Sequence, residues 1–317
     1  MANAREVRGR IRSVKNIGQI TRALEAVSAS RVRRAQARML ASRAYSEKAW
    51  EILLNVQNSA ARGTPLHPLL TPREEINTAL IILITSDRGL AGAFNTNILR
   101  AAQRFADRIP ESEIRWVTVG RKGRDSLIRE RENVIAEFSN QAEPSFAQIA
   151  PIGRLAIDEF LSGAADEVFI AYTDFINTLT QQPRVMRLLP LIPYEPEDLA
   201  IAEFVRDVPQ VTEGVQDYEY EPNATAILDE IVPRFTELQL YQTILESQAS
   251  EHSARMVAMR NASDNADSLA DDLNLVYNKA RQQGITEEIL DIVGGAEALQ
   301  QSINKTADSI ESTLVSV

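Results

Sequence analysis

Two long segments at the ends of this chain contain almost no residue that interrupts a helix, and this feature constrains the fold more than any other. The first, about Arg5–Asn58, contains no proline and only two glycines, Gly9 and Gly18. The second follows Pro233, after which the remaining 84 residues contain no proline. At 1.5 Å per residue, a helix of that length would reach roughly 125 Å, far more than a helix in a globular domain. The sequence therefore predicts two long terminal helices.

Apolar or small residues recur in both segments at alternating spacings of three and four, which is typical of a coiled-coil seam. The predicted N-terminal stripe is Val7, Ile11, Val14, Ile17, Ile20, Leu24 and Val27. The predicted C-terminal stripe is Met256, Met259, Ser263, Ala266, Ala270, Leu273, Tyr277 and Ala280. Its small members favour close approach of a second helix, so both termini are expected to form one antiparallel coiled coil.

The same spacing continues to the end of the sequence. The residues that carry it are Ile303, Ala307, Ile310, Leu314 and Val317. A loose tail has no need for apolar residues at heptad spacing, although terminal residues often fray. We therefore expect residues 300–317 to be helical.

The middle of the chain alternates between strand and helix patterns. The breaker RGTPLHPLLTP at 62–72 predicts a boundary. Four strands are then expected at 79–85, 116–120, 134–138 and 167–173, with helices near 97–106, 122–131 and 146–161 between them. Such alternation predicts a Rossmann-like α/β domain with a mainly parallel sheet, inserted between the N- and C-terminal helices. The expected domains are 1–60, 73–222 with an acidic excursion at about 193–222, and 223–317.

Charge is distributed unevenly along the chain. Residues 1–44 hold eleven Lys/Arg against Glu6 and Glu25, and the formal net charge of the whole chain is −10. The remainder therefore carries about −19 by subtraction. A basic helix of this kind could follow the phosphates of a nucleic acid. However, aromatic residues are not interleaved with its arginines and the rest of the chain would repel a polyanion, so an acidic protein partner is the simpler interpretation.

Several kinds of site are disfavoured by composition. The chain has no cysteine, which excludes disulfides, thiolate metal sites and a thiol switch. Its two histidines, His67 and His252, give no cluster for a metal or for a Ser-His-Asp relay, so no metal, cofactor or catalytic residue is predicted. No apolar run is long enough to span a membrane, and the first residues have no signal-peptide core, so no direct membrane insertion is expected.

The segment TSDRGLAGAFN (85–95) follows a strand and precedes a helix, where phosphate-binding loops are found. A P-loop has the pattern GxxxxGK[ST], because its lysine and hydroxyl contact phosphate and magnesium. Here Gly89 and Gly92 are followed by Ala93, Phe94 and Asn95, and the dinucleotide pattern GxGxxG is also absent. The segment is therefore interpreted as a tight structural turn.

Longer motifs give a family resemblance. They are IRSVKNIGQITRALEAVSASRVRRAQ (11–36), ITSDRGLAGAFN (84–95), VGRKG (119–123), LLPL (188–191), ASEHSARMVAMRNASDNADSL (249–269) and LVYNKARQQGITEEILDIVGGAEAL (275–299). In this order they closely resemble the gamma subunit of F-type ATP synthases, and the resemblance covers about 5–300.

The resemblance implies a function without an active site in this chain. Gamma subunits are the central rotor shaft of a proton-translocating ATP synthase, and they couple rotation of the membrane ring to conformational cycling of the catalytic beta subunits. The implied partners are the alpha and beta subunits of the hexamer, the epsilon subunit and the membrane c-ring, with one gamma copy per complex and no nucleic acid. The implied location is the cytoplasmic face of a bacterial inner membrane, rather than a thylakoid membrane.

The resemblance also implies contact residues. Arg281, Gln282 and Thr286 match positions that contact the beta-subunit catch loops, and the basic residues Arg31, Arg33 and Arg34 lie on the helix that faces acidic levers of beta. Tyr218, Glu219 and Tyr220 match the region near the epsilon and ring contacts.

Two departures from relatives are visible. The excursion after LLPL is longer than in many bacterial relatives but lacks the paired cysteines of the chloroplast version, and the chain continues about 18 residues beyond GGAEAL. Two other classes of function remain open from sequence: a coiled-coil nucleic-acid-associated protein, which salt-sensitive duplex binding would reveal, and an α/β enzyme, which turnover without partners would reveal.

Overall fold

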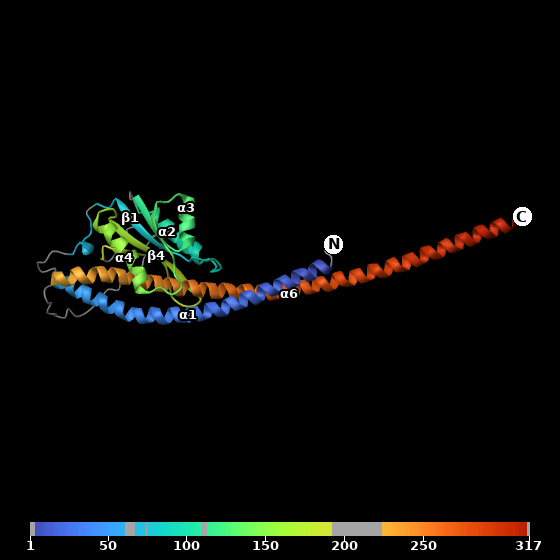
Figure 1. Cartoon of the computed structure of the whole chain (residues 1–317), viewed down its shortest axis with the longest axis horizontal. Helices are drawn as coiled ribbons and strands as arrows, with labels where there is room; N and C mark the ends of the chain where they lie inside the picture. Colours follow the sequence, from blue (N-terminus) through green and yellow to red (C-terminus); the bar gives the residue numbers. More distant parts are fainter. Residues whose placement is uncertain (1–3, 61–66, 74, 110–112, 192–223, 316–317) are drawn as a thin grey trace. The chain divides into compact units, whose positions relative to one another are not determined.

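The computed structural model describes residues 4–60, 67–73, 75–109, 113–191 and 224–315 (Figure 1). Its helices are α1 (Ala4–Ala60), the short 3-10 helix η1 (Pro68–Leu70), α2 (Phe94–Ala106), α3 (Arg121–Glu130), α4 (Phe146–Leu161) and α6 (Ala224–Val315). Its strands are β1 (Thr78–Ile84), β2 (Glu113–Val119), β3 (Val134–Phe138), β4 (Glu167–Phe175) and β5 (Gln181–Leu189). The two long terminal helices and the α/β region predicted from sequence are thus confirmed.

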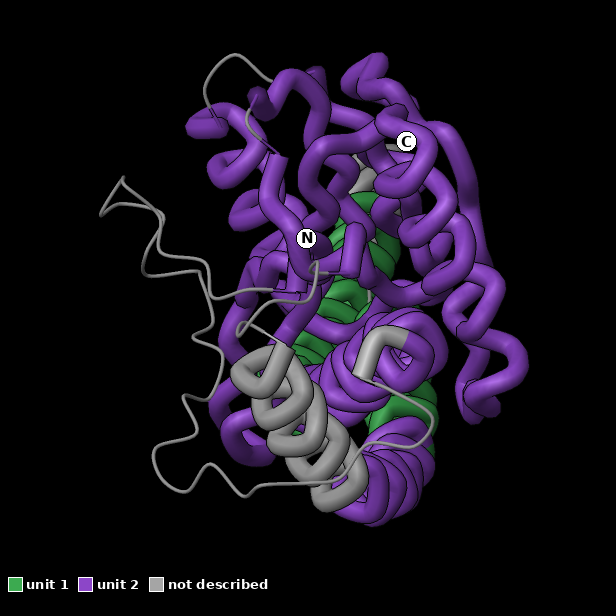
Figure 2. The backbone as a smooth tube through the Cα atoms, turned by 90° about the vertical axis from the view of Figure 1, so that its left-hand side faces the viewer, with its two compact units in different colours: residues 1–23, 260–317 green, residues 24–259 purple. Residues whose placement is uncertain are grey.

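The chain divides into two compact units, coloured separately in Figure 2. One comprises residues 1–23 and 260–317, and the other comprises residues 24–259. The α/β domain and the adjoining parts of α1 and α6 therefore belong to one unit. The domain boundaries expected from sequence at 60, 73 and 222 remain predictions.

The second unit is built on a five-stranded sheet with the order β3-β2-β1-β4-β5. The first four strands pair in parallel, and β5 pairs antiparallel to β4. β1 lies at the centre and its apolar run is buried on both faces, as expected for a strand of a parallel sheet. The mainly parallel sheet expected from sequence is therefore present.

Two apolar cores lie on the two faces of this sheet. On one face, Ile81 and Leu83 of β1 belong to a cluster with residues of α2 and α3. On the other face, Leu80 and Ile82 belong to a cluster with residues of α4 and α6. The α6 members of that second cluster are Leu228, Val232, Phe235, Leu240 and Ile244. The start of α6 is therefore part of the domain core.

Strand β5 was not predicted from the sequence. It is an edge strand, and Pro183 lies opposite Thr173 of β4. Proline cannot donate to a ladder and is tolerated at an edge. Arg187 of β5 forms a buried ion pair with Glu167 of β4, with nitrogen and oxygen 2.8 Å apart. This pair joins the strand to the sheet.

In the first unit, α1 and α6 contact each other through small residues and run antiparallel. The hydroxyl groups of Thr21 and Ser263 lie 2.7 Å apart. Three residues earlier in α1 and three later in α6, a Cβ built on Gly18 would lie 3.4 Å from the Cβ of Ala266. The opposite directions of these steps establish an antiparallel pair, as predicted.

The N-terminal stripe predicted from sequence is wrong in part. Ile17 and Ile20 are exposed, with 54% and 60% of their surface accessible, and Val27 is exposed as well. The buried positions are three, four or seven residues apart, and they depart from the predicted stripe after Val14. This series is Val7, Ile11, Gly18, Thr21, Ser28, Val32, Ala35 and Met39. Close helix approach selects small residues for the seam, and the larger isoleucines face outward.

The C-terminal stripe is confirmed in its central part. Met259, Ser263, Ala266 and Ala270 are buried. The other predicted members are half-buried: Met256, Leu273, Tyr277 and Ala280. The helix continues to Val315, so the expected helical continuation beyond residue 300 is confirmed up to that residue. Within the described part of the chain, no helix is long and apolar enough to cross a membrane.

Candidate functional site

The turn after β1 is held by packing and hydrogen bonds that involve two glycines of the VGRKG motif. A Cβ on Gly120 would lie 2.2 Å from the carbonyl oxygen of Thr85, and Gly120 has a left-handed φ of 106°. The backbone N–H of Gly123 donates to the Thr85 hydroxyl at 2.8 Å. Only glycine fits at position 120, because any side chain would overlap the end of β1. This geometry agrees with the interpretation of the segment as a structural turn.

The start of α3 already has an anionic partner within the chain. The Arg121 N–H at this helix terminus donates to Asp87 Oδ1 at 2.9 Å, and the Asn140 N–H donates to the same oxygen at 3.4 Å. Helix N-termini favour negative charge. The Asp87 carboxylate therefore already accepts an N–H at a helix terminus where an anion could otherwise bind.

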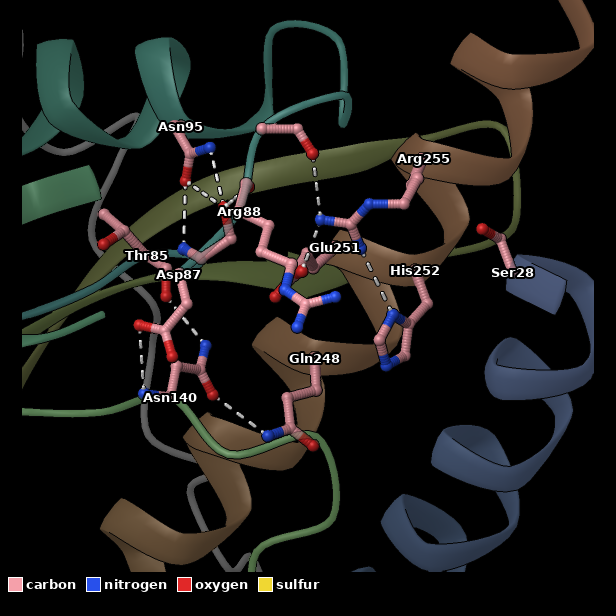
Figure 3. A network of polar contacts seen from close by, with 12 residues as sticks. Ser28, Thr85, Asp87, Arg88, Asn95, Asn140, Gln248, Glu251, His252 and Arg255 are labelled. Carbon is pink, nitrogen blue, oxygen red and sulfur yellow. Dashed lines mark hydrogen bonds and ion pairs between the residues drawn. The ribbon is translucent and has the colours of Figure 1, made fainter. Parts of the chain in front are cut away.

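Side chains of α6 reach into this region from the other side (Figure 3). Gln248 donates to Asn140 Oδ1 at 3.0 Å, and Arg255 donates to the carbonyl oxygen of Gly89 at 3.3 Å. Arg255 also forms an ion pair with Glu251 at 2.7 Å, in which both side chains are almost 90% buried. The contacts link α6 to the turn after β1 and to the segment after β3.

These residues line a hollow of about 450 Å³, which we call the junction hollow. Its charged lining residues are Arg31, Asp87, Arg88, Arg121, Glu251 and Arg255. The lining includes four arginines and two carboxylates, so it is polar and carries an excess of positive charge.

Two titratable groups at the junction hollow have shifted pKa values. Burial raises the pKa of Glu251, against the opposing effect of Arg255. Burial, together with the positive charges of Arg255, Arg31 and Arg34, lowers the pKa of His252 to about 4. His252 is therefore neutral at physiological pH and can pack against three arginines without added repulsion.

The predicted basic residues of α1 are exposed. Arg31 lines the junction hollow, and Arg34 forms an ion pair with Glu143 at 3.3 Å. Arg38 donates to the same carboxylate at 2.7 Å and lowers its pKa. Arg33 lies on the exposed surface of the helix. Part of this basic surface thus pairs within the chain, and its contact with beta subunits remains a prediction.

The predicted catch-loop residues lie together on an exposed part of α6. Arg281, Gln282 and Thr286 are all exposed, and the Thr286 hydroxyl donates to the carbonyl oxygen of Gln282 at 3.0 Å. Their surroundings leave the side chains of Arg281 and Gln282 accessible to another protein. The other predicted contact residues, Tyr218, Glu219 and Tyr220, lie outside the described residues, as does the acidic excursion.

Sequence reasoning missed the polar contacts of Gln248, Glu251 and Arg255. The available signal was the run QASEHSAR, which places polar and charged residues on every face of one helical segment. Such a segment must find polar partners if it is buried. Among the described residues, no group of three or more His, Asp or Glu could hold a metal ion.

Comparison with known proteins supports one family. The family model described as ATP synthase matches residues 3–299. The ATP synthase gamma chain of Roseiflexus castenholzii is 44% identical over 308 residues, which cover 95% of this chain and all of the relative. The ATP synthase gamma chain of Dehalococcoides mccartyi strain ATCC BAA-2100 is 46% identical over 300 residues, covering 94% of this chain and all of the relative.

Solved structures support the fold. A chain from the Euglena gracilis mitochondrial ATP synthase structure of OSCP, F1 and c-ring in rotational state 3 has a TM-score of 0.63 at 18% identity, covering 93% of this chain and 94% of that chain. A chain from the Tetrahymena thermophila mitochondrial ATP synthase central stalk and c-ring has a TM-score of 0.55 at 23% identity, covering 77% of this chain and 99% of that chain. The sequence matches span nearly the whole of this chain and of its relatives, and the chain therefore belongs to the ATP synthase gamma chain family.

Proposed function

We propose that this chain is the central shaft of a proton-translocating F-type ATP synthase. The observation that carries the proposal is the match of 95% of the chain to the full length of bacterial gamma chains. The antiparallel contact of α1 and α6 at Gly18 and Ala266 supports it, because two paired helices resist bending better than one. Turning of this shaft would pass motion between a membrane ring and the catalytic subunits.

The shaft acts through its shape and surface. A single pair of helices has no threefold symmetry, so each orientation presents a different surface to each of three catalytic sites. A surface that contacts two conformations of a neighbour differently shifts the balance between them. Exposed Ile17 and Ile20 of α1, and Arg281 and Gln282 of α6, supply different chemistry on different faces. Rotation would therefore change the nucleotide affinity of each site in turn.

The proposed partners follow from this role. They are the alpha and beta subunits around the shaft, and epsilon and the c-ring at the α/β domain, with one copy of this chain per complex. Arg31, Arg33 and Arg34 are proposed to face acidic segments of beta. The assembled complex would lie on the cytoplasmic face of a bacterial inner membrane.

The chain is proposed to contribute no catalytic site of its own. The turn at 85–93 has no lysine. At the N-terminus of α3, the Arg121 N–H already donates to Asp87. Calorimetric titration of the full chain with magnesium-ATP is expected to show at most weak binding. Micromolar binding that disappears in Gly92→Ala would contradict this part of the proposal.

Co-assembly tests the function as a whole. The chain is expressed together with the other subunits of the same ATP synthase in a host strain whose gamma gene has been deleted. It should co-purify with alpha and beta and restore ATP-driven proton pumping in inverted vesicles. The same strain without the chain is the control. Purification of a complete, proton-pumping complex that lacks this chain would refute the proposal.

A further inference from the structure

The junction hollow lies within the unit of residues 24–259. Its lining comes from α1, from the turn after β1, from the start of α3, from the segment after β3 and from α6. Its volume of about 450 Å³ falls in the range of pockets that bind small molecules. A small ligand in the hollow would therefore be contacted from several sides.

The charges that line the junction hollow do not balance. Four arginines against two carboxylates leave an excess of two positive charges, with both carboxylates counted as ionised. His252 adds no charge at neutral pH, because its pKa is lowered to about 4. A ligand with two negative charges would neutralise the hollow.

Both carboxylates of the hollow already have partners. Glu251 forms its ion pair with Arg255 at 2.7 Å. One oxygen of Asp87 accepts the backbone N–H groups of Arg121 and Asn140 at 2.9 and 3.4 Å. These two carboxylates are therefore engaged in contacts that leave other arginines of the lining uncompensated.

Three of the four arginines have no such partner. Within the described ranges of the chain, the side chains of Arg31, Arg88 and Arg121 form no hydrogen bond or ion pair. They come from three different elements, and Figure 3 shows Arg88 extending from the turn after β1 toward α6. Like charges that line one hollow repel each other, and an anion between them would replace the repulsion by attraction.

The guanidinium group favours one class of anion. It presents several N–H donors in one plane and pairs with phosphate oxygens through parallel hydrogen bonds. A phosphate ion has oxygens on all sides of its central atom, so different oxygens can accept from arginines on different elements. A single carboxylate has both oxygens in one plane and neutralises only half of the excess charge. The chemistry of the lining therefore matches a tetrahedral dianion.

We infer that the junction hollow is a binding site for a phosphate-like dianion, which Arg31, Arg88 and Arg121 hold by their guanidinium groups. The Arg121 N–H at the start of α3 already donates to Asp87, so side chains rather than the helix terminus bind the ion. The bound ion connects α1, the turn after β1 and α3. It stabilises the folded chain, because a ligand that binds only the folded form shifts the unfolding equilibrium.

The test titrates the full chain with inorganic phosphate and measures binding by calorimetry. Arg121→Gln removes one of the three guanidinium groups. Arg129→Gln is the matched control, because Arg129 is an exposed arginine of the same helix that does not line the hollow. Hydrogen bonds to charged groups are among the stronger ones, so we expect Arg121→Gln to weaken phosphate binding roughly tenfold. Arg129→Gln should leave the affinity within about twofold of wild type, as expected for weak surface electrostatics.

Thermal unfolding of the same three proteins gives a second measurement. A ligand at ten times its dissociation constant lowers the unfolding equilibrium constant about elevenfold. Phosphate also stabilises folded proteins in general, because it is excluded from their surfaces. The variants are therefore compared in sodium phosphate and in sodium chloride of equal ionic strength. We expect the extra stabilisation by phosphate in wild type and Arg129→Gln to be largely lost in Arg121→Gln.

The chloride buffer separates a binding role from a structural one. Without phosphate, Arg121→Gln should unfold at the same temperature as wild type or at a higher one, because it relieves repulsion between arginines. A lower unfolding temperature in chloride together with unchanged phosphate affinity would show a structural arginine and overturn the inference.

A parallel titration with ADP identifies the source of the anion. Tighter binding of phosphate than of ADP would assign the site to the free ion, and tighter binding of ADP would assign it to the phosphate groups of a nucleotide. In either case Arg121→Gln must weaken the binding. The absence of saturable binding, or equal affinities of Arg121→Gln and Arg129→Gln, would overturn the inference. Neither result bears on the proposed function, which co-assembly tests separately.

Discussion

Leucine substitutions at Gly18 and Gly9 would measure how closely the two shaft helices pack. Both glycines lie in α1, but a Cβ at position 18 would lie 3.4 Å from the Cβ of Ala266, whereas a Cβ at position 9 would meet nothing within 4 Å. Replacing glycine in a helix by leucine gains about 0.5–1 kcal/mol of helix propensity at either site. At position 18 the extra atoms also overpack the seam, which costs about 1–3 kcal/mol.

The difference between the two variants isolates the packing effect, because the propensity gain is common to both. We expect Gly18→Leu to have a free energy of unfolding about 1–3 kcal/mol lower than Gly9→Leu. Urea unfolding of the full chain, followed by far-UV circular dichroism, would measure it. Adding Ala266→Gly to Gly18→Leu should recover part of the loss, because it removes the methyl group that the leucine meets. Equal stability of the two leucine variants would refute the close seam.

Three further predictions concern function and pH. Arg281→Ala with Gln282→Ala should lower coupled ATP synthesis in reconstituted vesicles while the chain still folds and assembles; normal synthesis rates would show that these exposed side chains are dispensable. Because the pKa of His252 is lowered from 6.5 to about 4, the unfolded chain binds a proton more readily, so stability is full above pH 6.5 and falls by about 3 kcal/mol as the pH decreases to 4. His252→Gln should remove that part of the pH dependence in urea titrations, and an unaltered slope would contradict the burial of a neutral imidazole. Deletion of 300–317 should lower the thermal stability of the assembled head without abolishing rotation; rapid amide exchange throughout this segment in the wild-type complex would show that its apolar residues are uncovered.

The sequence predicted the helices of the shaft but only part of the face of α1 that forms the seam. Hydrophobicity favoured Ile17 and Ile20, because larger apolar residues usually occupy coiled-coil cores. The structure instead buries Gly18 and Thr21. Small residues contribute little to a hydrophobic pattern. Their burial is favoured only because the partner helix has small residues opposite them, Ser263 beside Thr21 and Ala266 beside Gly18. Information about one helix was therefore insufficient to choose the face.

The α/β region was predictable where strands are continuously apolar. β5 was missed because Pro183 and two arginines interrupt its pattern, and its edge position makes that composition acceptable. The glycine turn was interpreted as structural from the residues it lacks, and the packing of Gly120 and the hydrogen bond from Gly123 to Thr85 agree with that interpretation. The polar contacts of α6 could not be predicted, because they join Gln248 and Arg255 to segments more than 100 residues away in the chain.

The participation of α6 in the domain core has a consequence for synthesis on the ribosome. All five strands are complete by Leu189, but one face of the sheet is covered in part by Leu228, Phe235 and Ile244. A nascent chain that has just finished β5 would expose apolar side chains on that face, which makes it prone to aggregation or chaperone binding. The domain can close only after residue 244 has left the exit tunnel. Its folding is therefore delayed until the shaft has begun to form, and a fragment that ends after β5 would be unable to bury this face.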